Sequence, residues 1–536
     1  MCPQFNLEEF ALTADRIREK AIAENRLLDN PSLEELKALV GKQSGVRKTI
    51  YDNFVAESEP TSRSQMFTKN SVDDPYGEKE RELLRQCEQA LAGERLISID
   101  RIVGNEKSGT VVRLIVPEKF AHIAYGGGNL FVPVKKMVKK PDYQIVFLGD
   151  ESWETNEAKP LPEKDITIRA AMLDDGRVIK IVRNSNYIGE YKKGVFMAED
   201  WVAKTRRGGL FIHAGCREDY LQLAHGGYQP VRTLLTALSA NGKTTTTCRI
   251  LARKGMERSW LIQDDGGTLM PDGSFHGFEQ GGVFVKTEGV NPGEQVEIYY
   301  GLLKSGTMCE NVYVNQEGDF DFENYERTTN GRAVVLRKDF MHASPQIDVE
   351  RIDNFIIITR GPIIPAISKL TLQQAAALMV LGQAMESSAG DPTQAGMIRS
   401  EFFYDPFIAG DRAEHANIFY EIVNGLPHIN FYLINTGGVG DITHYNYKDI
   451  SVGHTMEILD SLLRGGLEDW VDSPTGFKVP AAIRAVDDIL VHPERLYSRD
   501  EFEQKQKELN RIRYEAVEKI GGALHSDIKS VFAKNG

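Results

Sequence analysis

The chain has 536 residues, of which 41% are hydrophobic and 26% charged, a composition typical of a globular protein with roughly two to four domains. Its net charge of −13 argues against nucleic acid as a partner, because phosphate backbones bind basic surfaces, but it does not exclude small anions. No apolar run approaches the roughly 18 residues of a membrane span, the start lacks a secretory leader, and the five scattered cysteines indicate reduced thiols, so we expect a cytoplasmic protein.

The N-terminal region, residues 1–208, changes from helical to sheet-like patterns along its length. Ser32, followed by Glu35 three residues later, forms a capping box ahead of a periodic apolar stretch, which predicts a helix. Residues 59–71 are polar and loop-like. Short β-rich runs separated by Gly, Pro and Asp follow, and they predict a mixed-sheet lobe. These runs cover residues 110–117, 143–149 and 178–183.

From residue 209 to residue 536, strand and helix patterns alternate, which predicts an α/β lobe. The segment 231–238 is a strand candidate, 239–244 a loop, and 245–255 a helix ending at a glycine. Further strands are predicted at 259–265, 354–361 and 431–437, and further helices at 371–388 and 498–521. The last of these helices is highly charged and is expected to lie on the outside.

The sequence "TALSANGKTTTT" resembles a phosphate-binding loop but departs from the pattern G-x-x-x-x-G-K-[ST]. Ala237, Ala240 and Asn241 stand where the pattern favours a flexible backbone. Such residues cost about 1–2 kcal/mol only where the backbone needs a positive φ. In a phosphate loop, backbone N–H groups bind the anion, Lys243 reaches its terminal phosphates, and the Thr244 hydroxyl binds magnesium. We therefore interpret the segment as a working loop of altered shape.

Four segments in order, "NYIGEYKKGVF", "GLFIHAG", "LSANGKTT" and "LIQDD", resemble the ATP-dependent phosphoenolpyruvate carboxykinases. That family carries a Tyr-x-Gly-Glu-x-Lys-Lys-Gly-x-Phe segment, a strand with a histidine, a phosphate loop and a strand that ends in two aspartates. The resemblance extends from about residue 60 to about residue 515. It implies a two-lobed α/β fold, with a substrate-binding lobe at residues 1–208 and a nucleotide- and metal-binding lobe at residues 209–536.

The resemblance also implies roles for individual residues. A lone lysine pair is usually solvated and a lone histidine usually belongs to a core, but their joint occurrence with the phosphate loop favours a site. Divalent metal ligands would be Lys193, His213, Thr244 and Asp265, with Asp264 orienting them, and the ions would be Mg²⁺ and Mn²⁺. The nucleotide, ATP or another triphosphate, would contact Leu238, Ser239, Ala240, Asn241, Gly242, Lys243, Thr244, Thr245 and Arg332. Substrate and phosphoryl transfer would involve Arg63, Tyr187, Lys192, Lys193, Lys243 and Arg332.

The implied reaction is the reversible decarboxylation of oxaloacetate to an enolate, which takes the γ-phosphoryl group to give phosphoenolpyruvate. A mobile lid would exclude water, and residues 359–396 are where we expect it, with Gly390 and Gly396 as hinges. The partners would be these small molecules, with neither nucleic acid nor a membrane. The chain would act as a monomer or a small homo-oligomer.

The chain departs from the family after "YLINTGG", where an arginine and a threonine would contact the nucleotide. His444 stands near the arginine position, and Ile450 or Ser451 near the threonine position. Gly266 and Gly267 also replace a Glu-His pair. Two other functions therefore stay open. One is a kinase of the same fold acting on a different small carboxylate or hydroxyl substrate, and the other is a non-enzymatic nucleotide sensor or structural protein.

Overall fold

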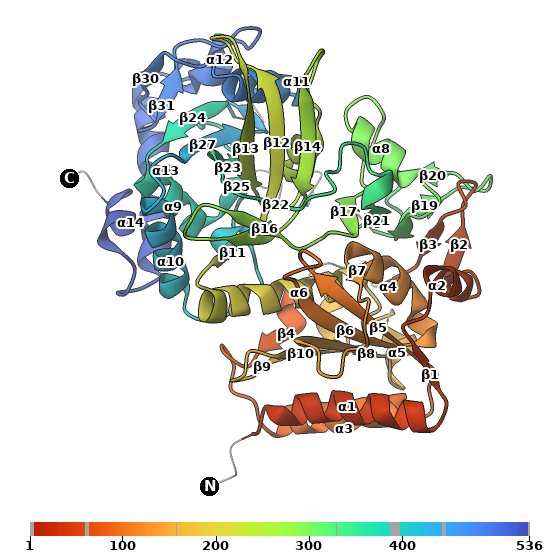
Figure 1. Ribbon diagram of the computed structural model, residues 1–536. Helices are drawn as coiled ribbons and strands as arrows, with labels where there is room; N and C mark the ends of the chain where they lie inside the picture. Colours follow the sequence, from red (N-terminus) through yellow and green to blue (C-terminus); the bar gives the residue numbers. More distant parts are fainter. Residues whose placement is uncertain are drawn as a thin grey trace. The chain divides into compact units, whose positions relative to one another are not determined.

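A computed structural model describes residues 5–58, 64–156, 158–328, 330–385, 397–441 and 446–533. The chain divides into two compact units (Figure 1). The first unit contains Met1–Arg207, Gly277–Met341 and Phe407–Gly410, and the second contains Gly208–His276, His342–Pro406 and Asp411–Gly536. One predicted assignment needs correction, because residues 277–341, which were expected in the C-terminal lobe, form part of the first unit.

The larger sheet of the first unit is mixed, with the strand order β1-β5-β6-β8-β10-β9-β4. Its strands are β1 (Leu27–Asp29), β4 (Thr68–Asn70), β5 (Leu96–Val103), β6 (Thr110–Pro117), β8 (Tyr143–Leu148), β9 (Thr167–Met172) and β10 (Val178–Arg183), with β7 (Val132–Pro133) beside β5. The predicted runs at 110–117, 143–149 and 178–183 are confirmed as β6, β8 and β10. Their residues are almost all buried, which fits strands covered on both faces.

Helices cover the sheet of the first unit. Figure 1 shows α1 (Glu8–Ala23) and α3 (Glu78–Leu91) side by side along one face. Their apolar sides share one core cluster with β6, β8 and β10. The helix α6 (Ile188–Val202) packs on the sheet through Gly194, where an added Cβ would lie 2.8 Å from Ile145 and from Lys180. The predicted capping box is confirmed at α2 (Leu33–Val40), whose N-cap is Ser32.

A smaller sheet in the first unit has the order β17-β21-β18-β3-β2. The strands are β17 (Gly282–Lys286), β21 (Arg332–Leu336), β18 (Met308–Glu310), β3 (Phe54–Ala56) and β2 (Val46–Lys48), and α8 (Val296–Leu302) packs on β21. The register sets Arg332 opposite Lys286 on one side and Glu310 on the other. Three charged residues of the candidate site therefore lie in one row across this sheet.

The second unit is built on a sheet with the order β14-β12-β13-β23-β27-β24-β31-β30. Its strands are β14 (Arg258–Gln263), β12 (Ala214–Gln222), β13 (Tyr228–Thr236), β23 (Asn354–Thr359), β27 (Asn430–Asn435), β24 (Ile367–Leu370), β31 (Lys478–Pro480) and β30 (Trp470–Asp472). The strands β13, β23 and β27 are parallel neighbours, so their carboxyl ends meet at one edge. Ligands in open α/β sheets bind at such edges.

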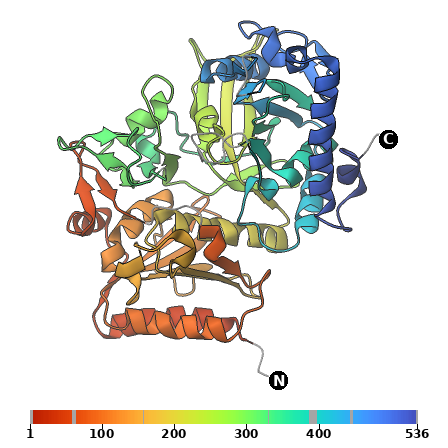
Figure 2. The same ribbon diagram turned by 180° about the vertical axis from the view of Figure 1, so that it is seen from behind.

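Further helices surround this sheet: α9 (Leu372–Leu381), α10 (Arg412–Asn424), α11 (Val452–Leu463) and α13 (Arg499–Glu518). Figure 2 shows α13 along the outside of the unit, as its charged sequence predicts, and its N-cap is Ser498. The predicted helix 371–388 is too long. It ends at Gly382, which adopts a left-handed backbone, and β25 (Gln383–Met385) follows. Residues 386–396, with the expected hinges Gly390 and Gly396, lie outside the described residues.

The helix predicted at 245–255 is also shorter than expected, since α7 covers only Lys243–Cys248. The buried Arg217 explains this early end. Its guanidinium donates to the carbonyl oxygens of Thr246, through Nη1, and of Arg249, through Nη2 at 2.7 Å. These carbonyls would otherwise accept from the next helical turn, so the side chain takes the place of a continued helix.

Two expectations from composition can be compared with the described residues. Within them, no helix combines the length and apolarity that a membrane crossing requires. Cys87, Cys216, Cys248 and Cys309 are buried and form no disulfide, as the cysteine pattern predicts.

Candidate active site

The segment 237–244 connects β13 to α7 at the edge where the parallel strands end. Of the three residues that depart from the phosphate-loop pattern, Ala240 alone has a positive φ, of 68°, and Gly242 follows with a φ of 87°. Asn241 instead donates its side-chain amide to the carbonyl of Leu238 at 3.2 Å. Its own carbonyl accepts from the Thr436 hydroxyl, 2.8 Å away, just beyond β27. The strain expected of the altered loop is thus confined to Ala240.

Lys243, Asp265 and His213 meet in one cluster of the second unit. The Lys243 ammonium forms an ion pair with Asp265 Oδ1, and His213 Nε2 lies 2.9 Å from the same oxygen. His213 Nδ1 lies 2.8 Å from the carbonyl oxygen of Tyr404. Because a carbonyl can only accept, Nδ1 is the ring nitrogen that carries the proton.

This tautomer leaves two electron-pair donors facing each other, Nε2 of a neutral His213 and Oδ1 of Asp265. They are compatible at 2.9 Å only if the ring is doubly protonated or if a cation binds both. Imidazole and carboxylate are common ligands of divalent cations, and a ligand histidine usually donates its other N–H to a carbonyl, as His213 does to Tyr404. The pair therefore fits a divalent cation. Among the described residues no group of three or more His, Cys, Asp or Glu side chains could hold a metal.

Asp264 and Thr244, two other predicted residues of this unit, are sequence neighbours of Asp265 and Lys243. Asp264 directly follows β14 and is buried, and Thr244 is the second residue of α7 and is half-buried. The Ser451 hydroxyl caps α11, where it accepts from the backbone N–H of His454 at 3.2 Å. His444 lies outside the described residues.

Tyr187 belongs to the first unit and is the N-cap residue of α6. Its ring lies against Gly189, where an added Cβ would come 2.2 Å from the ring carbon Cε1. No side chain fits at that position, which explains the Tyr-x-Gly spacing of the motif. Burial raises the pKa of the Tyr187 hydroxyl well above its usual value, so the group stays protonated.

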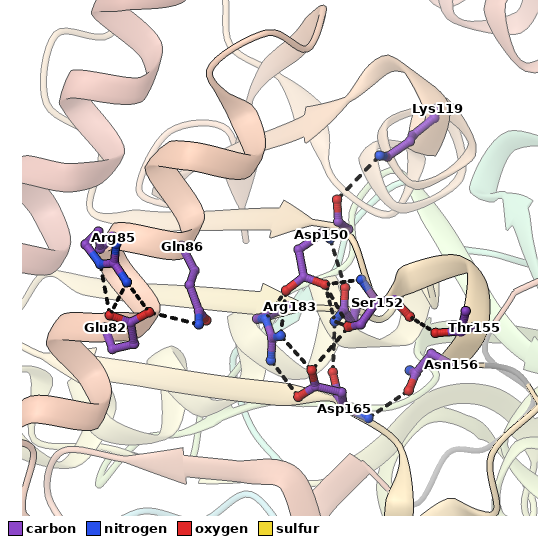
Figure 3. A network of polar contacts seen from close by, with 12 residues as sticks. Glu82, Arg85, Gln86, Lys119, Asp150, Ser152, Thr155, Asn156, Asp165 and Arg183 are labelled. Atoms are coloured by element: carbon purple, nitrogen blue, oxygen red, sulfur yellow. Dashed lines mark hydrogen bonds and ion pairs between the residues drawn. The ribbon is translucent and has the colours of Figure 1, made fainter.

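A polar network fixes the loop that leads to Tyr187 (Figure 3). Arg183, at the end of β10, donates Nε to Asp150 at 2.6 Å and pairs both terminal nitrogens with Asp165 at 2.7 Å. Its guanidinium lowers the pKa of Asp165. Asn184 has a φ of 61° and donates to Asp150 at 2.9 Å. Side-chain hydrogen bonds and ion pairs thus hold this loop in place, and such contacts cannot be recognised from the periodicity of the sequence.

Each of the two motif lysines pairs with a buried glutamate of its own unit. Lys192 Nζ lies 3.0 Å from Glu279, and Lys193 Nζ lies 2.9 Å from Glu190. Glu190 also binds the buried Lys180 at 3.0 Å. Lys193 lies over the Tyr187 ring, 5.1 Å from its centroid. Lys193 is thus held beside Tyr187, whereas Lys192 lies over the rings of Phe196 and Phe284.

Arg332 begins β21 and forms an ion pair with Glu288, with Nη1 3.1 Å from Oε1. Glu310, opposite Arg332 in the sheet, accepts from the backbone N–H of Ile188 at 2.7 Å. Burial raises the pKa of Glu310 to about 8, although that hydrogen bond lowers it. The buried side-chain amide of Asn330 has no hydrogen-bond partner among the described residues, so it is available to a ligand.

Sequence reasoning missed the glutamates of this site and Asn330. Glu190 lies inside the recognised motif and could have been found there. Glu279, Glu288 and Glu310 are isolated in the sequence, and only the strand register brings Glu310 beside Arg332. Tyr187, Lys192, Lys193 and Arg332 share the first unit, whereas His213, Lys243, Thr244 and Asp265 share the second. Arg63 lies outside the described residues.

Comparison with known proteins shows which protein family the sequence resembles. A sequence model of the phosphoenolpyruvate carboxykinase family matches residues 11–489. A phosphoenolpyruvate carboxykinase (ATP) from Aeropyrum pernix is 28% identical over 320 residues, which cover 59% of this chain and 62% of that protein. The protein of the same name from Agrobacterium fabrum is 24% identical over 471 residues, 86% of this chain and 83% of that protein. A third, from Christiangramia forsetii, is 27% identical over 403 residues, 72% and 71% of the two chains.

Proposed function

The chain belongs to the phosphoenolpyruvate carboxykinase family, and we propose that it converts oxaloacetate and ATP reversibly to phosphoenolpyruvate, CO₂ and ADP. The family match over residues 11–489 confirms the predicted class of enzyme. It does not favour the alternative of a kinase for a different small substrate.

The observation that carries this proposal is the cluster of Lys243, Asp265 and His213 at the start of α7 and the end of β14. In the proposed role, the loop Leu238–Thr245 binds the nucleotide phosphates and Lys243 neutralises the transferring phosphoryl group. His213, Asp265, Thr244 and Lys193 would hold Mg²⁺ and Mn²⁺. When bound, these ions supply positive charge to the phosphates and to the developing enolate oxygen.

The first unit would bind the organic acid. Arg332 presents a planar fork that can pair two carboxylate oxygens, and the Tyr187 hydroxyl can donate to a third. Lys192 adds positive charge, and the Asn330 amide offers a further donor. Arg63, which the family resemblance assigns to a carboxylate, completes the set in this proposal. With these groups fixed, catalysis consists of positioning and electrostatic stabilisation, and no covalent enzyme intermediate is needed.

We also propose roles for the two units and for the phosphate loop, together with a cellular location and an oligomeric state. The two units would act as the substrate lobe and the nucleotide lobe, with segment 237–244 as a functional P-loop. The protein would work in the cytoplasm as a monomer or small homo-oligomer, without nucleic acid or a membrane as partner.

A coupled assay tests the proposed reaction. Purified protein is given oxaloacetate with Mg²⁺ and Mn²⁺, and ATP, GTP and pyrophosphate are compared as phosphoryl donors. Phosphoenolpyruvate is detected directly, and the reverse direction is assayed with phosphoenolpyruvate, ADP and bicarbonate by the oxaloacetate and ATP that form. Formation of phosphoenolpyruvate with ATP supports the proposal. ATP binding that depends on the metal, without turnover in either direction, contradicts it.

A further inference from the structure

Arg332, the arginine proposed to bind the substrate, already has an anionic partner in its own unit. Glu288 Oε1 lies 3.1 Å from Arg332 Nη1, and both side chains are only 11% exposed. An ion pair so little exposed is weakly screened by water and salt. A substrate carboxylate that binds Arg332 through the same face must therefore compete with this glutamate.

Glu288 also has a second cation within reach. Its other oxygen, Oε2, lies 3.5 Å from Lys286 Nζ, and this oxygen accepts no hydrogen bond from the described residues. Lys286 is 32% exposed, so it is better solvated than Arg332. The register places Lys286 directly opposite Arg332 across β17 and β21. The carboxylate thus lies between one buried and one more exposed cation.

Two carboxylates cannot share Arg332 through one nitrogen without cost, because like charges about 4 Å apart repel strongly where water is scarce. Glu310, on the other side of Arg332, is held by the backbone N–H of Ile188 and is not the group that moves. Glu288 can move with little loss, because a small rotation exchanges its Arg332 contact for Lys286.

We propose that Glu288 is a built-in competitor for Arg332, which the substrate carboxylate displaces toward Lys286. This inference rests on the proposed function and deepens it, since it identifies what sets the affinity of the site for small dianions such as oxaloacetate and phosphoenolpyruvate. We therefore expect the site to bind its anion more weakly than the same cations would bind it without Glu288.

Calorimetric titration with oxalate, an unreactive dicarboxylate, and with phosphoenolpyruvate tests the proposal in the presence of Mg²⁺. Glu288→Gln keeps the shape and one hydrogen bond to Arg332 but removes the competing charge. We expect this variant to bind both anions about tenfold more tightly than the wild type, which corresponds to about 1.4 kcal/mol. Glu317 is exposed and forms no ion pair with another described residue, so Glu317→Gln provides the control, with unchanged affinity expected.

A double-mutant cycle with Lys286→Met separates the proposed movement from direct contact. If Lys286 receives the displaced glutamate, its loss weakens oxalate binding severalfold in the wild type but not in Glu288→Gln. Equal weakening in both backgrounds would mean that Lys286 contacts the anion itself. That result, or a Glu288→Gln variant that binds oxalate no more tightly than the wild type, overturns the proposal.

The inference about Glu288 and the proposed reaction can fail separately. If the wild type forms phosphoenolpyruvate but Glu288→Gln gains no affinity, the inference is wrong and the proposed function stands. If the wild type forms no phosphoenolpyruvate but Glu288→Gln still binds oxalate more tightly, the competitor is supported and the proposed reaction is contradicted.

Discussion

The two units differ in how their cationic side chains are paired with carboxylates. In the second unit, Lys243 and His213 share one partly exposed carboxylate, Asp265, whose side chain is 21% exposed. In the first unit, Lys192, Lys193 and Arg332 each pair with a different glutamate, and these glutamates are 0–11% exposed. A shared, partly exposed carboxylate can bind an incoming cation, and an incoming phosphate can compete with it for the lysine. Glu279 and Glu190, which are almost fully buried, instead hold Lys192 and Lys193 in place before any ligand arrives, whereas Glu288 is the partner that we propose to move.

Removal of a group from the shared cluster should have the largest effect. We predict that Lys243→Ala and His213→Ala each lower kcat/KM for phosphoenolpyruvate formation by about 10³-fold, because one cluster neutralises the transferring phosphoryl group. Lys254→Ala, at an exposed lysine beyond α7, serves as the matched control and should retain activity. Residual activity within tenfold of the wild type in either active-site variant would contradict the role of the cluster.

Arg332→Lys tests the role of the corresponding cation in the first unit. The charge is kept but the planar fork is lost, so we expect kcat/KM to fall by about 10²-fold and KM for oxaloacetate to rise. Steady-state kinetics with varied oxaloacetate measures both. An unchanged KM would show that Arg332 does not bind the organic acid.

These residues also show what a sequence can and cannot predict. The strands were predictable because their apolar runs are long, and the caps at Ser32 and Ser498 because capping is local. The helix at 245–255 was predicted too long because Arg217, distant in the sequence, takes its last carbonyls. His213, Lys243 and Asp265 were predictable from motifs.

Apart from Glu190, which lies three residues before Lys193, the glutamates of the first unit were not predictable, because only long-range contacts define them. Glu310 meets Arg332 through strand register and meets Ile188 through a hydrogen bond across 122 positions of the chain. Ala240 shows a middle case. The motif indicated that strain was conceivable at three positions, and only the backbone angles identify which one carries it.

Glu310 gives the first unit a distinctive pH dependence. Burial raises its pKa in the folded state to about 8, from an ordinary value of 4.5, so between these values the folded state holds a proton that the unfolded state has lost. Its contribution to stability is therefore full below about pH 4.5 and is lost as the pH rises through about 8. Glu310→Gln should remove this component, so its melting temperature should fall less between about pH 5 and about pH 9. A pH dependence identical to that of Glu317→Gln would contradict the assignment.

The smallest effect is expected in the phosphate loop. Ala240→Gly should raise the free energy of unfolding of the second unit by about 1 kcal/mol, because glycine adopts the observed φ of 68° without strain. Ala237→Gly is the matched control. Ala237 is buried and has a negative φ, so this change should destabilise the unit by about 1 kcal/mol. Urea unfolding of both variants measures the difference, and equal signs would place the strain elsewhere.

The central claim is that this chain joins decarboxylation to phosphoryl transfer. Incubation of oxaloacetate labelled with ¹³C at the departing carboxylate, together with ATP, Mg²⁺ and Mn²⁺, can be followed by ¹³C and ³¹P NMR in one sample. The account predicts labelled CO₂, ADP and phosphoenolpyruvate in equal amounts, all abolished in Lys243→Ala. Phosphorylation without loss of the labelled carboxylate, or CO₂ with pyruvate in place of phosphoenolpyruvate, would contradict it.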